Sequence, residues 1–195
     1  MRSSQVFTGY KQKPILTNIM TTNLLEGDSN RPLESPSMQI GTRFWISRSA
    51  VQTRWLGQTI ASKAQAGDIV CVVGDLGTGK TTFTKGVGVG LGLREDDITS
   101  PSFSIVAEHR YGRIKMYHLD VYRLTSPTDL SNLGFDDYLS ASDGLIVIEW
   151  ADLVADIIPS DRLVITLTAG PKPNERQIRA QEHGPASRRL LEAAP

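Results

Sequence analysis

The chain has 195 residues, with 21 lysine and arginine residues balanced by 21 aspartate and glutamate residues. A protein that mainly coats nucleic acid carries a clear basic excess, so this balance argues against that class. No apolar stretch reaches the roughly 18 residues of a membrane span, so we expect no membrane partner. The single cysteine, Cys71, excludes a disulfide within the chain and favours a reducing compartment. We therefore expect a cytoplasmic protein with no disulfide-linked partner.

The length indicates one domain, with a shorter segment on either side of it. Residues 1–40 mix polar residues with three prolines and show no sustained periodicity, which is typical of a flexible N-terminal extension. Two alternatives stay open. One is an over-long start, with Met20 or Met38 as the initiator, and the other is a transit peptide, because no acidic residue precedes Glu26, although arginines are few there. Residues 41–182 are expected to form the domain, and residues 183–195 a frayed helix or C-terminal tail.

An edge strand at residues 42–46 and an amphipathic helix are expected to open the domain. Ser49 and Gln52 have the spacing of a capping box, which marks the start of the helix, and Gly67 closes it. Trp55 is predicted to anchor the core from the apolar face of this helix. That face contains Val51, Trp55, Leu56, Ile60 and Ala64.

A glycine-rich stretch follows, and it fits the pattern G-x-x-x-x-G-K-S/T at Gly74, Gly79, Lys80 and Thr81. Residues 69–73 before it form a short apolar run rich in β-branched residues, which is typical of a buried parallel strand. The residues after it can continue as a helix. Strand, glycine loop and helix together are the context in which this pattern forms a phosphate-binding loop, or P-loop.

The chemistry of such a loop suits a nucleotide. Glycines allow positive φ, so that successive N–H groups converge on an anion, and the dipole of the following helix favours negative charge there. Lys80 would neutralise the β and γ phosphates, and Thr81 would offer its hydroxyl to Mg²⁺. The predicted nucleotide-binding residues of the loop are Gly74, Asp75, Leu76, Gly77, Thr78, Gly79, Lys80, Thr81 and Thr82.

The helix after the loop is unusual because Gly86, Gly88, Gly90 and Gly92 alternate with apolar residues. Each interior glycine costs about 0.5–1 kcal/mol relative to alanine. Either the helix ends early, or close packing, for example onto the sheet, holds it in place. Gly92 is a suitable C-terminal stop.

A hairpin and a short helix are expected next. Residues 103–109 and 114–119 flank a Tyr-Gly-Arg turn and indicate two antiparallel strands. A short helix is expected from Ser126 to Gly134, with proline at its first position, and another helical turn at residues 136–139.

Three more strands are expected in the remainder of the domain. The continuous apolar run at residues 145–148 predicts a second buried strand. Residues 162–168 alternate between apolar and polar, which predicts a half-buried strand. Residues 174–180 are predicted to pair back as an edge strand.

Two carboxylates are placed to complete a hydrolytic site. P-loop proteins need a carboxylate at the end of a neighbouring strand, either to hold Mg²⁺ through water or to polarise the attacking water. Glu149 directly follows the apolar run at 145–148, and Asp120 follows the strand at 114–119. Ligands of open α/β sheets bind at the carboxyl ends of the strands, so both side chains are predicted to be catalytic. Glu149 is also predicted to ligate Mg²⁺ together with Thr81.

The roles of two nearby residues stay open. His118 lies two residues before Asp120 and so shares a strand face with it, where it is either a proton shuttle or a packed histidine. Arg123 is either a phosphate ligand or a salt-bridge partner.

Four blocks together resemble the TsaE family, also called YjeE, the small P-loop ATPases of bacterial tRNA threonylcarbamoyladenosine synthesis. The blocks are residues 74–83, 100–103 (Ser-Pro-Ser-Phe), 117–124 (Tyr-His-Leu-Asp-Val-Tyr-Arg-Leu) and 148–150 (Ile-Glu-Trp). The resemblance covers roughly residues 45–180. The first block alone is ambiguous among P-loop proteins, whereas the third and fourth are specific in combination.

The resemblance implies an α/β fold, a P-loop NTPase-like three-layer sandwich in which helices cover both faces of a mixed, mostly parallel sheet. It implies that the loop binds ATP, that Thr81 and Glu149 hold Mg²⁺, that Asp120 is needed for ATPase turnover and that Trp150 lies beside the site. The implied role is that of an ATPase that helps TsaD and TsaB. These partners attach threonylcarbamoyl to the adenosine next to the anticodon, so the involvement of tRNA is indirect.

The chain departs from the family pattern at a few positions. Residue 102 is Ser where the family often has Thr, and residue 78 is Thr where Ala is common. Arg176 corresponds, through a weak motif, to an arginine that faces the nucleotide. Residues 1–40 have no counterpart in the family.

Three other functions compete with this interpretation. A small-molecule kinase needs a lid with several arginines, but only Arg123 lies between Asp120 and Arg162. A GTPase needs a guanine-reading Asn-Lys-x-Asp motif, which the sequence does not contain. A nucleotide sensor without turnover keeps the same loop, so the sequence leaves it open, although Asp120 and Glu149 together favour hydrolysis.

Overall fold

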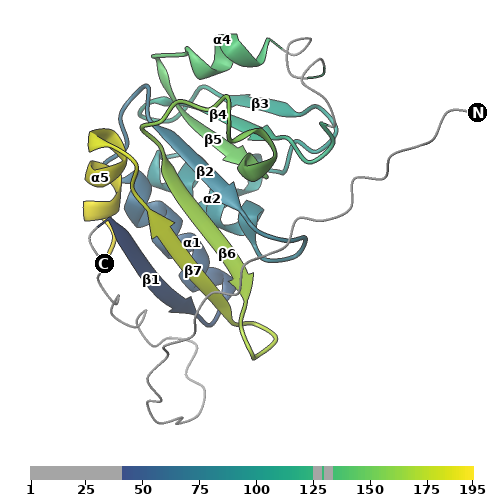
Figure 1. Cartoon of the computed structure of the whole chain (residues 1–195), viewed down its shortest axis with the longest axis vertical. Helices are drawn as coiled ribbons and strands as arrows, with labels where there is room; N and C mark the ends of the chain where they lie inside the picture. The colour runs from purple at the N-terminus through teal and green to yellow at the C-terminus, as the bar shows by residue number, and fades with distance from the viewer. Residues whose placement is uncertain (1–40, 125–128, 130–133) are drawn as a thin grey trace, which may run out of the picture.

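The structure is a computed structural model that describes residues 41–124, 129 and 134–195 (Figure 1). The predicted N-terminal extension lies outside these residues, as does most of the short helix predicted from Ser126 to Gly134. The helical turn expected at residues 136–139 is present as part of α4 (Phe135–Leu139). None of the helices in the described ranges combines the length and the apolar character needed to span a bilayer.

Seven strands of the described residues form one sheet in the order β1-β7-β6-β2-β5-β4-β3 (Figure 1). The four central strands β6, β2, β5 and β4 run parallel, and the pairs at both edges are antiparallel. This confirms the predicted mixed α/β fold and the antiparallel pairing of β3 with β4. The strands are β1 (Thr42–Ser47), β2 (Ile69–Val73), β3 (Val106–His109), β4 (Lys115–Asp120), β5 (Gly144–Glu149), β6 (Leu163–Ala169) and β7 (Arg176–Gln181).

One predicted strand position is wrong. Residues 174–180 were expected at an edge, but β7 lies between β6 and β1 and pairs with both. The edge strand on this side is β1, as predicted for residues 42–46. β1 comes from the start of the domain, so its pairing with β7 joins segments far apart in the chain. Local patterns carry no information about such a pairing.

Helices cover both faces of the sheet, which gives the predicted three layers. On one face, α1 (Ala50–Ala61), α2 (Lys80–Gly90) and α5 (Pro185–Glu192) contribute to a large apolar cluster. On the other face, a second cluster contains α4 and the 3₁₀ turn η2 (Ala151–Val154). A further 3₁₀ turn, η1 (Glu95–Asp97), follows α2.

β2 lies between the two apolar layers, and its residues alternate between them. Val70 and Val72 belong to the cluster beneath α1 and α2, whereas Ile69 and Cys71 belong to the opposite one. Burial raises the pKa of the Cys71 thiol to about 12, so this group stays protonated and behaves as a small apolar side chain.

Close contact between α1 and α2 explains two glycines of the series, Gly86 and Gly90. A Cβ atom at Gly86 would lie 2.0 Å from the carbonyl oxygen of Arg54, and one at Gly90 would lie 2.5 Å from that of Gln58. From the other side, a Cβ atom at Gly57 would lie 2.4 Å from the carbonyl oxygen of Phe83. Gly86 and Gly90 therefore allow α2 to pack against the backbone of α1, whereas a Cβ atom at Gly88 would lie 2.2 Å from Cδ1 of Ile98.

The helix α2 ends in a C-terminal motif that depends on a glycine, Gly92. Gly92 has φ of 88°, and the N–H of Leu93 donates to the carbonyl of Gly88 while that of Gly92 donates to Val89. This pair of hydrogen bonds is a Schellman motif, and it confirms Gly92 as the residue that stops the helix.

The predicted start of α1 is confirmed, and its predicted apolar face is confirmed in part, because Leu56, Ile60 and Ala64 are buried whereas Val51 and Trp55 are exposed. Ser49 caps the helix by accepting a hydrogen bond from the backbone N–H of Gln52. The predicted anchor Trp55 is 44% exposed, and the tryptophan in the core is Trp45 of β1, which is 2% exposed. The buried side of α1 is turned toward α2, and Gly57 lies at its centre, so a large side chain at 55 remains outside the contact.

The C-terminal segment is part of the domain rather than a frayed tail. The helix α5 buries Leu190 and Leu191 against the same layer as α1 and α2. The carboxylate of Asp161 accepts hydrogen bonds from the N–H groups of Ala186 and Ser187, which caps the start of α5.

Gly86→Ala tests the contact between the two helices. The added methyl group meets backbone atoms that cannot rotate away, so the variant is expected to lose about 1–3 kcal/mol of unfolding free energy. Urea denaturation measures this loss. The control Lys85→Ala, on the same helix and half-buried, should stay within about 0.5 kcal/mol of the parent. A Gly86→Ala protein as stable as the parent would contradict the assigned contact.

Candidate functional site

The glycine loop joins the carboxyl end of β2 to the start of α2. Gly74, Gly77 and Gly79 all have positive φ, with values of 147°, 78° and 101°. A Cβ atom at Gly74 would also lie 2.3 Å from the carbonyl oxygen of Leu167 in β6. The loop therefore needs glycine both for its backbone angles and for its approach to the sheet. Gly79 is the N-cap of α2 and provides no side-chain cap, so the first N–H groups of the helix face the loop.

Lys80 crosses the loop and is buried there. Its Nζ donates hydrogen bonds to the carbonyl oxygens of Gly74 and Asp75 at 2.6 and 2.8 Å. The same ammonium group lies 3.6 Å from the centroid of the Trp150 ring, which is a cation–π contact. Burial lowers the pKa of Lys80, and the nearby charge of Glu149 offsets only part of that shift. The structure thus places Trp150 against the lysine of the loop, beside the site as the family resemblance implies.

The strand-end carboxylate of Glu149 connects the loop to β4. Its Oε2 accepts a hydrogen bond from Thr81 Oγ1 at 2.9 Å, and its Oε1 lies 2.9 Å from His118 Nε2. Parallel pairing places Glu149 level with Asp120 of β4 and with Val72 of β2. The predicted pair of magnesium ligands, Thr81 and Glu149, is therefore in direct contact.

The second carboxylate, Asp120, lies beneath the Ser-Pro-Ser loop. Its Oδ2 accepts hydrogen bonds from the hydroxyls of Ser100 and Ser102 at 2.5 and 2.7 Å, and its Oδ1 accepts one from the N–H of Tyr122. Ile105, which follows this loop, has φ of 66°, a left-handed conformation that β-branched residues rarely adopt. No local sequence pattern predicts the hydrogen bonds from the two serines or the strained backbone at Ile105.

The structure places two arginines, Arg123, whose role the sequence left open, and Arg176, which matched the family only through a weak motif. Arg123 stacks on the ring of Phe103 at 4.3 Å, and Phe103 is itself strongly exposed. Arg176 at the start of β7 donates hydrogen bonds from Nε to the carbonyl of Thr78 at 2.9 Å and from Nη2 to that of Gly77 at 3.1 Å. It therefore braces the glycine loop from the side opposite Glu149.

A cleft of about 100 Å³ lies beside the loop, between the start of α1 and the β6–β7 turn. Its wall includes Thr82 of α2, Thr53 of α1 and Asn174 of the turn. Sequence patterns missed the contribution of α1 and of the turn, because these segments meet the loop only in the folded chain. The remaining lining residues are Ser49, Ala50, Thr78, Gly79 and Arg176.

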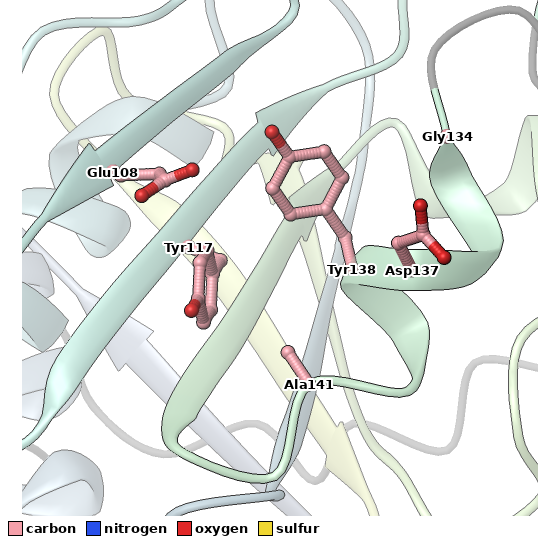
Figure 2. A pocket seen from close by; sticks show the side chains of 6 residues that line it. All are labelled: Glu108, Tyr117, Gly134, Asp137, Tyr138 and Ala141. Atoms are coloured by element: carbon pink, nitrogen blue, oxygen red, sulfur yellow. The ribbon is translucent and has the colours of Figure 1, made fainter.

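A larger cavity of about 310 Å³ lies elsewhere, between the β3–β4 edge and α4 (Figure 2). Figure 2 shows the rings of Tyr117 and Tyr138 and the carboxylate of Glu108 around it. None of its lining residues is among those predicted to bind nucleotide or metal. The predicted site is therefore at the glycine loop and its cleft, not in the larger cavity.

The residues of the site fit a magnesium ion that is shared with a ligand. Within the described ranges, no group of three or more His, Cys, Asp or Glu side chains is arranged to hold a metal ion. Mg²⁺ uses few protein ligands and completes its coordination with phosphate oxygens and water. The Thr81 hydroxyl and the Glu149 carboxylate, which touch each other, are the kind of oxygen pair that such an ion takes.

A glycine loop between a central parallel strand and a helix, with carboxylates at the ends of two neighbouring strands, defines an α/β protein with a P-loop NTPase-like fold. The structure is similar to the crystal structure of YdiB from Bacillus subtilis, with a TM-score of 0.65 and 33% sequence identity. The match covers 80% of this chain and 95% of that chain.

Sequence comparison identifies the family. Residues 47–178 match the profile of the family described as "Threonylcarbamoyl adenosine biosynthesis protein TsaE", and the chain belongs to this TsaE family. Relatives described as tRNA threonylcarbamoyladenosine biosynthesis protein TsaE include one from Bacillus subtilis (strain 168), 37% identical over 69% of this chain and 82% of the relative. Another, from Treponema pallidum (strain Nichols), is 39% identical over 63% of this chain and 88% of the relative.

The contact between Lys80 and Trp150 can be tested by a double-mutant cycle. Lys80→Met and Trp150→Leu, alone and together, are expected to show a coupling of about 0.5–2 kcal/mol in urea denaturation, because the ammonium group is buried over the ring. The exposed pair Arg123 and Phe103 is the control, and its coupling should be smaller. Additive effects at Lys80 and Trp150 would exclude the contact.

Proposed function

We propose that this protein is a magnesium-dependent ATP-binding and ATP-hydrolysing accessory protein of tRNA threonylcarbamoyladenosine modification, acting in the cytoplasm with TsaD and TsaB. Membership of the TsaE family supports the pathway. One observation carries the proposed activity: Lys80, Thr81 and Glu149 converge at the carboxyl edge of the sheet, in front of the glycine loop.

The proposal gives each part of the nucleotide a place that this arrangement supports. The N–H groups of the loop and of the start of α2 suit the phosphates, with Lys80 as their counter-charge. Thr82 follows the loop and lines the cleft that Arg176 and α1 complete, so this cleft suits the nucleoside. In this proposal, ATP alone gives the polar groups at this edge of the sheet a role, and no second organic substrate is needed.

The hydrolytic step is assigned to the two strand-end carboxylates. Thr81 and Glu149 would hold Mg²⁺, which when bound neutralises charge on the β and γ phosphates. Asp120 lies one strand further from the loop, where its carboxylate can orient a water molecule. Ser100 and Ser102 both donate to Oδ2 of Asp120, and the N–H of Tyr122 donates to Oδ1, so this carboxylate has few acceptor sites left for a water molecule. That shortage is consistent with slow hydrolysis by the isolated chain.

A reconstituted assay tests the role in the pathway. Threonylcarbamoyladenosine formation on tRNA is measured over several turnovers with TsaD and TsaB, with or without this protein and ATP. We expect product to continue to accumulate only when the protein is present, and Lys80→Met to behave like its omission. Equal accumulation in both reactions would refute the accessory role, whatever the ATPase activity.

Glu149→Gln tests the metal and hydrolysis assignment. The substitution keeps the shape of the side chain but removes its charge, so magnesium-dependent ATP hydrolysis is expected to fall by about 10²–10⁴-fold. Phosphate release at varied Mg²⁺ concentration measures the change. The control Asp156→Asn removes an exposed acid just after η2 and should retain the parent rate. Unchanged turnover in Glu149→Gln would remove the assignment of Glu149.

A further inference from the structure

His118 is a fully buried polar residue in the middle of the candidate site. Its side chain is 0% exposed, and Nε2 lies 2.9 Å from Oε1 of Glu149. The other ring nitrogen, Nδ1, is also buried and has no hydrogen-bond partner among the described residues. A histidine in this setting is more than packing, because an apolar residue of similar size would avoid the unpaired nitrogen.

The contacts determine which nitrogen carries the proton. An ionised carboxylate only accepts hydrogen bonds, so the nitrogen that faces Glu149 must be the donor. A proton on Nδ1 would be a buried donor with no acceptor in the described part of the chain, which is costly. The favoured tautomer therefore has N–H at Nε2 and a bare Nδ1.

This arrangement also decides between the two roles left open for His118. A proton shuttle must exchange protons with solvent or substrate, but this ring is enclosed, and its second nitrogen contacts no described polar group. Its one hydrogen bond goes to the oxygen of Glu149 that does not contact Thr81. The ring thus constrains the rotation of the carboxylate and leaves Oε2 directed at Thr81.

We propose that His118 is a positioning residue, which donates from Nε2 to Glu149 and holds that carboxylate in the orientation that faces Thr81. This inference rests on the proposed function, in which Thr81 and Glu149 take Mg²⁺. Residues that orient a metal-binding side chain in this way typically change metal affinity or activity by about 10–100-fold when they are replaced.

Three variants test the role through magnesium dependence. His118→Leu removes the donor and is expected to raise the Mg²⁺ concentration for half-maximal ATP hydrolysis about 10–100-fold. His118→Gln keeps an N–H donor near the position of Nε2 and should restore most of the magnesium affinity. Met116→Leu, equally buried on the same face of β4, is the control and should leave the requirement unchanged. An unchanged magnesium requirement in His118→Leu would overturn the proposal.

A measurement without ATP keeps the inference testable if His118→Leu does not fold. The chain has three histidines, so side-chain ¹⁵N NMR of the wild type at neutral pH can resolve each ring. We expect the ring that disappears in His118→Gln to carry its proton on Nε2, and Glu149→Ala to abolish the slow solvent exchange of that proton. A proton on Nδ1, or a signal indifferent to Glu149→Ala, would refute the contact.

The two experiments also separate this inference from the proposed function. If Glu149→Gln hydrolyses ATP like the wild type, the proposed hydrolytic site is wrong, and the NMR result still decides whether His118 holds Glu149. If Glu149 is essential but His118→Leu is not impaired, the proposed function stands and the positioning role fails.

Discussion

The parallel pairing of β5 with β2 on one side and with β4 on the other determines where each polar group of the site lies. In this register Glu149 is level with Val72, just before the glycine loop, and with Asp120. Because the strands run in the same direction, their carboxyl ends meet at the edge where α2 begins. A shift of one residue in the β4–β5 pairing would place Glu149 and His118 on opposite faces of the sheet.

Several buried polar groups lie together at this edge of the sheet. Elsewhere in the protein, burying such groups would cost free energy. Lys80, His118, Asp120 and Glu149 are all nearly inaccessible to solvent, yet each has at least one partner of suitable chemistry. Burial in a medium of low polarity strengthens these contacts and penalises any group left without one. The apolar layers on both faces of the sheet are what stabilise the chain enough to keep such a cluster intact.

The sequence predicted the features that depend on neighbouring residues. The strands β2 and β5, the glycine loop, the cap at Ser49 and the stop at Gly92 all follow from runs or spacings within a few residues. The loop pattern and the strand-end rule also predict Lys80, Thr81, Glu149 and Asp120 at one edge of the sheet. The family resemblance added the position of Trp150 and the Ser-Pro-Ser loop.

Features that depend on contacts between distant segments were not predictable in the same way. Periodicity located an apolar face on α1 but not which part of it meets α2, so Trp55 was placed in the core where Trp45 lies. The position of β7 inside the sheet depends on β1, whose paired residues lie 129 to 139 positions earlier in the chain. The bonds from Arg176 to the loop and from Ser100 to Asp120 likewise join separate elements.

The contact between α1 and α2 has a consequence for how this sequence can vary. Most crowded positions in a core can be relieved by a smaller residue on the opposite side, so that a second substitution compensates the first. At Gly86 and Gly90 the opposing atoms are backbone carbonyls of Arg54 and Gln58, which every amino acid possesses. No replacement in α1 can make room there. These glycines, which lie outside the predicted ligand-binding residues, therefore restrict the acceptable sequences through the backbone alone.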